Sequence, residues 1–319
     1  MKNNLYIYIS YVILCISVSS CKKSEPLILP IVNVEEADSC YCKPLLEQEI
    51  SFGCGSCDTD FDETYLGSPI INPNNSDELI YLDNQYPNSR MMFYNIQTHE
   101  KRVLVNENVA SNFSWSKKDW VLFQRSADFN LYKVKSNGDS LTQLTYGGKW
   151  FHGQWNHEGN KFIVYRKFNS ISKSFIMNEQ GMVIDSLTNW QHRSGYWSHP
   201  LYYLGELTSL IAVINIENKS IVKNLNFGTN IRLVGWVSLE EFMYRQGTKL
   251  YLYNITTNQT KLIKCNCNTS YQTNTFSSDF SKILFVKIVD SLQTNNRIFE
   301  DSKLIFMNKD GTGEFEIIP

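Results

Sequence analysis

An aromatic residue returns at intervals of about forty residues through most of this chain, and this spacing constrains the fold more than any other feature. Trp115, Trp155, Trp197, Trp236 and Phe276 lie 40, 42, 39 and 40 residues apart. Each is followed by a short apolar run of β type, then by a third run, a turn and a fourth run. Four short strands in a period of about forty residues are typical of one blade of a β-propeller.

The sequence contains six such units, because residues 69–105 supply one more unit that lacks the aromatic residue. A blade is nearly flat and buries both faces only between two neighbours, so a row of blades closes into a ring. We therefore predict an all-β fold, a six-bladed β-propeller with four antiparallel strands per blade, over residues 64–319. The recurrent aromatic residues are expected at the start of the innermost strand, wedged between blades as core residues without a role in ligand binding.

The composition excludes several classes of protein. The chain of 319 residues is 42% hydrophobic and 19% charged, which provides ample material for a core. Its 30 Lys and Arg residues nearly balance its 32 Asp and Glu residues, so no overall positive field would attract nucleic acid. The sequence has no phosphate-binding loop, dinucleotide fingerprint or His-Glu-x-x-His helix, and we expect neither a cofactor nor a metal.

Residues 1–20 have the layout of a secretory signal peptide, in which Lys2 precedes an apolar stretch too short for a membrane span. The four residues that end in Cys21 resemble the lipobox of bacterial lipoproteins. The resemblance implies that Cys21 carries lipid and becomes the mature N-terminus, and we expect this lipid to be the sole membrane contact. An uncleaved anchor and ordinary secretion are the alternatives. The missing acidic residue after Cys21 favours the outer membrane, without indicating on which side.

Six further cysteines remain in the exported chain. They are Cys40, Cys42, Cys54, Cys57, Cys265 and Cys267. An even count outside the cytosol predicts disulfides, and a Cys-x-Cys pair closes poorly on itself. We expect residues 40 and 42 to be joined to residues 265 and 267, and Cys54 to Cys57, within a collar of residues 21–63. A zinc site of the first four cysteines is the alternative. The carboxylates of residues 58–63 fit an acidic linker better than a calcium loop.

Three segments resemble the WD40-like repeats of TolB-type six-bladed propellers, whose usual form is Trp-Ser-Pro-Asp-Gly before a strand. They are Trp115-Ser-Lys-Lys-Asp, Trp155-Asn-His-Glu-Gly and Met307-Asn-Lys-Asp-Gly. The resemblance covers residues 64–319 and is loose in the first, fourth and fifth blades. Because this fold serves many roles, it implies a binding scaffold more than a reaction. Peptidases with a similar ring also carry a Gly-x-Ser-x-Gly elbow, which this sequence lacks.

Antiparallel connectivity places the candidate binding residues on one face of the ring. We call the upper face the one at which the first strand of each blade starts and the second strand ends. The second strand ends in a basic residue in four blades, at Arg125, Arg166, Arg245 and Lys287. This arc would favour anionic ligands. The loops on either side of the third blade add Trp150, His152, Trp190 and His192, and a long connection over residues 290–302 completes the upper face.

These features favour a lipid-anchored binding scaffold of the bacterial cell envelope without catalytic activity, whose partner is a protein or glycan, in particular an anionic one. Two alternatives remain open. His152 and His192 with neighbouring arginines could serve a carbohydrate lyase, as histidines do in related pectate-degrading lyases. The protein could also be a structural component of an envelope complex.

Overall fold

The apolar runs of the repeat form twenty-four β-strands and no helix within the described part of the chain. A computed structural model describes residues 65–85, 88–110, 113–168, 171–187, 194–207, 210–228, 231–247, 249–265, 269–277, 279–292 and 298–317. Within these ranges no helix is long and apolar enough to cross a membrane. The strands form six separate antiparallel sheets of four, and each sheet uses four strands that are consecutive in the sequence.

The first three sheets, which we call blades 1 to 3, span residues 65–187. Blade 1 contains β1 (Tyr65–Asn72), β2 (Asn75–Gln85), β3 (Asn88–Asn95) and β4 (Lys101–Val105). Blade 2 contains β5 (Ser114–Trp115), β6 (Trp120–Gln124), β7 (Leu131–Lys135) and β8 (Thr142–Gln143). Blade 3 contains β9 (Trp150–Trp155), β10 (Lys161–Phe168), β11 (Ile171–Asn178) and β12 (Val183–Leu187).

Blades 4 to 6 repeat this arrangement over residues 194–317. Blade 4 contains β13 (Ser194–Tyr196), β14 (Tyr202–Leu207), β15 (Leu210–Asn215) and β16 (Ser220–Leu225). Blade 5 contains β17 (Ile231–Trp236), β18 (Glu241–Gln246), β19 (Lys249–Asn254) and β20 (Thr260–Cys265). Blade 6 contains β21 (Thr269–Phe276), β22 (Lys282–Leu292), β23 (Ile298–Asn308) and β24 (Phe315–Ile317).

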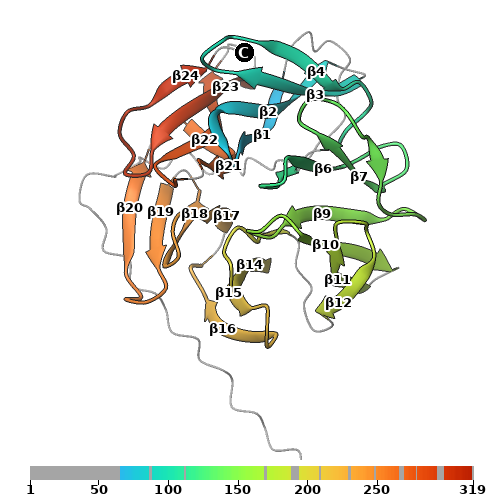
Figure 1. Cartoon of the computed structure of the whole chain (residues 1–319). Coiled ribbons are helices and arrows are strands. Elements are labelled where there is room, and N and C mark those ends of the chain that lie inside the picture. Colours follow the sequence, from blue (N-terminus) through green and yellow to red (C-terminus); the bar gives the residue numbers. More distant parts are fainter. Residues whose placement is uncertain are drawn as a thin grey trace, which may run out of the picture. The chain divides into compact units, whose positions relative to one another are not determined.

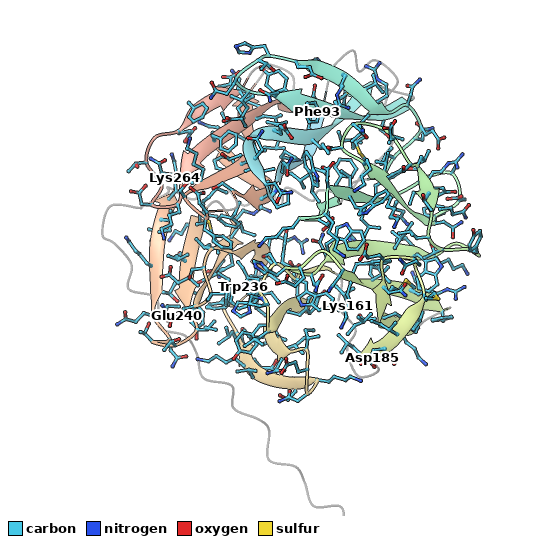
Figure 2. All side chains as sticks on the ribbon, in the orientation of Figure 1. Phe93, Lys161, Asp185, Trp236, Glu240 and Lys264 are labelled. Atoms are coloured by element: carbon cyan, nitrogen blue, oxygen red, sulfur yellow. The ribbon has the colours of Figure 1, made fainter. Side chains whose placement is uncertain are left out.

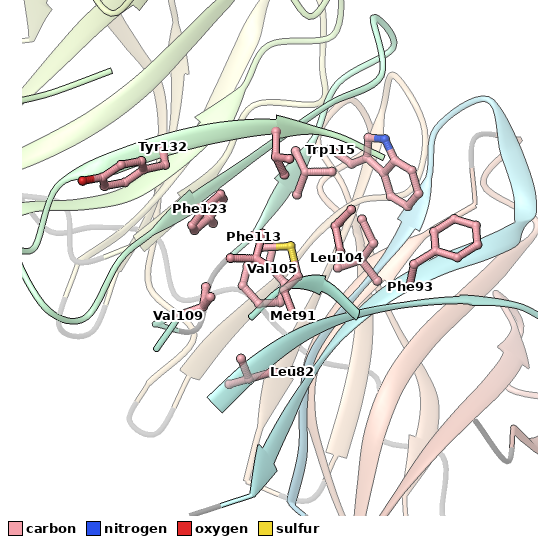
Figure 3. Packing of buried hydrophobic residues seen from close by; sticks show 13 residues of the cluster. Leu82, Met91, Phe93, Leu104, Val105, Val109, Phe113, Trp115, Phe123 and Tyr132 are labelled. Carbon is pink, nitrogen blue, oxygen red and sulfur yellow. The ribbon is translucent and has the colours of Figure 1, made fainter. Parts of the chain in front are cut away.

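The hydrophobic core is divided into six clusters, one between each pair of neighbouring blades. Successive side chains of a strand point to opposite faces of its sheet, so one strand serves two clusters. In β2, Leu79 and Tyr81 pack against blade 6, whereas Ile80 and Leu82 pack against blade 2. Figure 3 shows the cluster between blades 1 and 2, where Phe93 and Leu104 face Trp115 and Phe123. Neither face of a blade is therefore left to solvent.

The ring closes between blades 6 and 1. Each innermost strand contacts the innermost strands of both neighbours, and β21 contacts β1 (Figure 1). Leu284, Val286 and Phe306 of blade 6 share a buried cluster with Tyr81 and Met92 of blade 1. No described strand is exchanged between these two sheets, so side-chain packing rather than a shared ladder of hydrogen bonds joins them. The predicted six-bladed propeller with four antiparallel strands per blade is confirmed.

The recurrent aromatic residues lie between blades as expected, but at the end of the innermost strand rather than at its start. Trp115, Trp155 and Trp236 are the last residues of β5, β9 and β17, and Trp197 follows β13 directly. Each indole belongs to the cluster shared with the preceding blade. A tight turn to the second strand follows the aromatic residue, so the repeated motif marks the turn rather than the entry of the strand.

The connection predicted over residues 290–302 is also corrected. Most of this segment belongs to β22 and β23, whose antiparallel pairing extends to Leu292 opposite Ile298. The segment lacks the regular alternation of apolar and polar residues that marks a strand in a sequence, and Ile298 and Phe299 are the only apolar residues of its second half. Blade 6 thus carries a long hairpin at the upper face instead of a long loop.

Candidate functional site

The innermost strands surround a cavity of about 200 Å³ at the lower face of the ring. The cavity is lined by the ends of these strands and the turns that follow them. It therefore lies on the face opposite to the one at which the basic residues were predicted. Its aromatic walls come from Trp155, Tyr196, Trp236 and Phe276, and Ser114, Gln154 and Ser277 add polar groups. Figure 2 shows Trp236 close to the centre of the ring.

The backbone of the innermost strands contributes to this cavity. Each of these strands pairs with one neighbour only and forms the inner edge of its sheet. Edge strands present unpaired N–H and C=O groups that can bind an extended chain. Gly235 in β17 has a φ of 142° and adds no side chain to the wall between Tyr196 and Phe276. The cavity thus combines flat aromatic surfaces with a backbone that can form hydrogen bonds.

A chain of polar groups from three blades lies at the mouth of the cavity. The Nε2 atom of His157 lies 3.0 Å from Nζ of Lys117, and its Nδ1 atom lies 3.0 Å from the carbonyl oxygen of Ser198. An ammonium can only donate and a carbonyl can only accept. In this arrangement Nδ1 of His157 donates to the Ser198 carbonyl and Nε2 accepts from Lys117, so His157 holds the Lys117 ammonium beside the opening.

The four predicted basic residues lie at the upper face, and two of them form ion pairs. Nε of Arg125 lies 2.8 Å from Oε2 of Glu107, and Lys287 pairs with Glu314. Arg125 also donates to the hydroxyl of Tyr132 at 3.2 Å. The charge of Arg125 is therefore balanced locally, and that of Lys287 is balanced in part because Glu314 also pairs with Lys264, which weakens the field that an arc of cations would create.

Arg245 belongs to a buried polar group between blades 4 and 5. It lies opposite Arg232 in the pairing of β17 with β18, and Arg232 donates to Oε1 of the buried Glu206 at 2.8 Å. Burial lowers the pKa of Arg245, and the neighbouring Arg232 lowers it further. Glu206 also accepts a hydrogen bond from the backbone of Leu233 at 3.1 Å, so this carboxylate is fixed between the two blades.

Arg166 differs from the other three residues. Its guanidinium lies 4.5 Å from the ring centroid of Trp150 and 4.8 Å from that of Phe168, and it has no hydrogen bond or ion pair within the described residues. The indole below it is fixed, because Nε1 of Trp150 donates to the carbonyl of Tyr146 at 3.1 Å. Arg166 and Trp150 are thus the predicted site residues that the structure brings together.

His152 is half-buried, and an aromatic side chain covers one face of its ring. Its ring stacks on Tyr165 with 5.4 Å between the centroids, and burial lowers its pKa. Within the described ranges, no three His, Cys, Asp or Glu side chains gather in a metal-binding group. Trp190 and His192 lie outside the described residues, as do Cys21, Cys40, Cys42, Cys54, Cys57, Cys267 and the carboxylates of residues 58–63. Cys265 ends β20.

Sequence reasoning missed the lower-face cavity, although a signal for it was present. The residues just after the recurrent aromatic position include Lys117, His157 and Ser198, which are polar and vary between blades. Within its own blade each of these residues is an ordinary turn residue, and nothing in the sequence indicates that they lie close together. Only closure of the ring brings three such turns to one opening.

Comparison with known proteins agrees with this architecture. No protein-family description matches the sequence, and no curated protein matches it. Among solved structures, a protein assigned as a TolB from Agrobacterium tumefaciens has 15% identity and a TM-score of 0.55, over 70% of this chain and 86% of its own. The propeller domain of the trilobed protease from Pyrococcus furiosus has 12% identity and a TM-score of 0.52, over 82% and 97%.

The chain has the fold of these propellers. An oligogalacturonate lyase in complex with manganese is a third similar structure, with 11% identity and a TM-score of 0.50, over 77% of this chain and 75% of the lyase. At such identities the likeness concerns the fold alone. The Pyrococcus propeller is described as having an open velcro topology. The continuous sheets of blades 1 and 6 likewise show no exchanged strand within the described residues.

Proposed function

We propose that this protein is a non-catalytic binding scaffold of the bacterial envelope that takes an extended protein segment into its lower-face cavity. The observation that carries the proposal is the cavity itself, in which aromatic walls and inner strand edges meet around one opening. A volume of about 200 Å³ is small for a bulky cofactor, whereas a few residues of an extended chain fit it. The likeness to a TolB propeller supports a scaffold.

The chemistry of the cavity favours a protein segment. Edge strands can add an extended chain through main-chain hydrogen bonds, and aromatic pockets select its alternate side chains. The half-buried rings of Tyr196 and Phe276 offer the kind of large, rigid contact surface that dominates binding energy at protein interfaces. Lys117, held by His157 at the mouth, would favour a segment with a carboxylate near the opening.

Selection of random peptides displayed on phage tests this proposal. The wild-type protein should enrich a family of peptides, and Ser198→Trp, which places an indole at the mouth, should weaken their binding by about ten-fold or more. Ser220→Trp introduces the same side chain on the outer strand β16 of the same blade and should leave binding unchanged. No enriched family, or equal loss in both variants, would refute binding in the cavity.

We further propose that lipid on Cys21 anchors the protein and that a cysteine-linked collar joins the anchor to the ring. Cys265, at the end of β20, is disulfide-bonded, which supports a cross-link in this part of the chain. Labelled palmitate should be incorporated into the wild-type protein and not into Cys21→Ser, and that variant should leave the membrane fraction. Membrane retention of Cys21→Ser without label would point to an uncleaved anchor instead.

A further inference from the structure

Exposed aromatic side chains gather at one place on the ring. Among the described residues, the large exposed hydrophobic side chains include four aromatic ones, and three of these lie at the upper face of blades 2 and 3. Tyr146 is 72% exposed, Phe129 is 49% exposed and Phe168 is 41% exposed. Phe129 lies in the loop from β6 to β7, Tyr146 lies in the loop from β8 to β9, and Phe168 ends β10. All three are therefore near the tips of neighbouring upper-face connections.

These tips are joined into one surface by the start of β9. Phe129 contacts Phe151 with 6.1 Å between ring centroids, and the backbone N–H of Trp150 donates to the carbonyl of Phe129 at 3.0 Å. On the other side, Trp150 lies below the Arg166 guanidinium, which also covers the ring of Phe168. The aromatic side chains thus follow the seam between the two blades.

Four cationic side chains accompany the aromatic ones. They are Lys149, Arg166, Lys167 and Lys173. Arg166 lies directly opposite Lys173 in the pairing of β10 with β11, and the backbone N–H of Lys167 donates to the carbonyl of Lys149 at 3.1 Å. Like charges directly opposite on paired strands destabilise a sheet. None of the four pairs with a carboxylate within the part of the chain that the structure describes.

The adjoining loop contains one acidic residue, Asp128, whose carboxylate forms hydrogen bonds within its own loop and blade. Asp128 precedes Phe129, and its backbone carbonyl lies beside Gly148. Its carboxylate accepts hydrogen bonds from the hydroxyl of Tyr132 at 2.7 Å and from the backbone of Asn130 at 3.0 Å. Asp128 keeps its negative charge, but the four cations outnumber it, so the surface carries a net positive charge that favours an anionic partner.

We propose that these upper-face tips of blades 2 and 3 dock onto the surface of an anionic phospholipid bilayer. Aromatic side chains at loop tips prefer the interface between headgroups and acyl chains, and lysine and arginine beside them pair with lipid phosphates. A neutral glycan needs amide and carboxylate groups beside aromatic rings to bind its hydroxyls, whereas the exposed groups here are aromatic and cationic. Docking in this way turns the upper face to the bilayer and leaves the lower-face cavity open on the opposite side.

Flotation with lipid vesicles tests the proposal on residues 21–319 with Cys21→Ser, so that no lipid anchor contributes. The protein should bind vesicles of equal parts phosphatidylglycerol and phosphatidylcholine and should bind pure phosphatidylcholine much more weakly. Arg166→Ala with Lys173→Ala should weaken binding by about twenty-fold, since each cation near an anionic surface contributes about five-fold. The triple variant Phe129→Asn, Tyr146→Ser, Phe168→Ser should weaken it by about ten-fold.

Matched controls separate docking from general adhesion. Lys261→Ala with Lys309→Ala removes the same charge from exposed positions elsewhere, and Leu201→Ser with Leu239→Ser removes exposed apolar groups from lower-face turns. Both controls should bind vesicles as the parent protein does. Each variant should keep the parental unfolding temperature and peptide binding in the cavity, which shows that it is folded and that the two sites are separate.

Three results would overturn the proposal. The parent protein could fail to bind the anionic vesicles, or the control variants could lose binding as strongly as the tip variants. Alginate oligosaccharides could bind in place of vesicles and lose their binding in the tip variants, which would assign the surface to an acidic glycan.

Discussion

A single carboxylate distinguishes the recurrent tryptophans from one another. Nε1 of Trp115 donates to Oδ1 of Asp119 at 3.1 Å, whereas the buried Nε1 atoms of Trp155, Trp197 and Trp236 have no hydrogen-bond partner among the residues that the structure describes. The residues four positions after these three are Gly159, Leu201 and Glu240. Asp119 and Gly159 both have a positive φ, which explains why Asp and Gly suit this turn. Blades 3, 4 and 5 thus carry a buried donor without an acceptor among the described residues.

Replacing Asp119 tests the contribution of this hydrogen bond. Asp119→Gly keeps the left-handed backbone and removes the acceptor, so the free energy of unfolding should fall by about 1–2 kcal/mol. Asp119→Asn keeps an oxygen acceptor and the backbone preference, and it should lose clearly less. Urea unfolding measures both, and equal losses would show that the bond to Trp115 is not the cause.

The partial burial of His152 leads us to expect that stability depends on pH. Burial lowers its pKa, against a smaller opposing effect of Glu206, so the folded protein binds fewer protons than the unfolded chain below the ordinary histidine pKa of about 6.5. Stability is therefore complete above about pH 6.5 and falls on acidification. His199, whose pKa burial also lowers, adds to the same trend.

His152→Asn should reduce the drop in unfolding temperature between about pH 7.5 and pH 5.5, because asparagine tolerates the φ of 51° and does not titrate in this range. His99→Asn, at an exposed left-handed position, is the control and should keep the full drop. A drop in His152→Asn as large as in the wild type would contradict a role for this imidazole.

At the scale of strands and turns, glycine allows neighbouring blades to approach each other. Gly181 lies in the turn from β11 to β12, and a Cβ atom there would lie 2.3 Å from the backbone oxygen of Leu144 in the preceding blade. A Cβ atom at Gly311 would likewise lie 2.5 Å from the backbone oxygen of Ile263 in the preceding blade. The sequence predicted a turn between the third and fourth runs of each unit, but the close approach of this turn to another blade could not be read from it.

Gly181→Ala should lower the free energy of unfolding by about 2–4 kcal/mol, because strain at a φ of 79° adds to the clash with Leu144. Gly247→Ala has a similar backbone strain, at a φ of 58°, with no atom within 4 Å of the added Cβ. This control should lose about 1 kcal/mol. Similar losses in both variants would mean that packing between the blades tolerates the extra methyl group.

Sequence patterns predicted the elements well where side chains alternate between two buried faces. The runs at residues 79–82 and 283–286 are strands because their alternate residues fill two clusters. Patterns failed where pairing rather than burial decides, as in the extension of β22 to Leu292. They also failed for the cavity, whose lining comes from every blade, and for the ion pairs of Arg125 and Lys287, whose partners lie in other connections.

At the scale of the whole ring, closure depends on side chains alone. Blades 1 and 6 lie side by side in Figure 1 although nearly two hundred residues separate β1 from β21, and one shared cluster joins them. Each of the other five seams also has one cluster, but a chain connection crosses it. Closure of the ring is therefore best tested at the seam between blades 6 and 1.

Double electron–electron resonance measures the distance between two spin labels and so tests closure of the ring directly. The labels are attached through unnatural amino acids so that the native cysteines stay intact. Labels at the exposed Val103 of β4 and Phe315 of β24 report on blades 1 and 6, and labels at Val183 of β12 and Ile221 of β16 report on blades 3 and 4. A closed ring predicts similar, narrow distance distributions for the two pairs. A much longer or broader distribution for the pair at residues 103 and 315 would show an open row of blades and contradict the account.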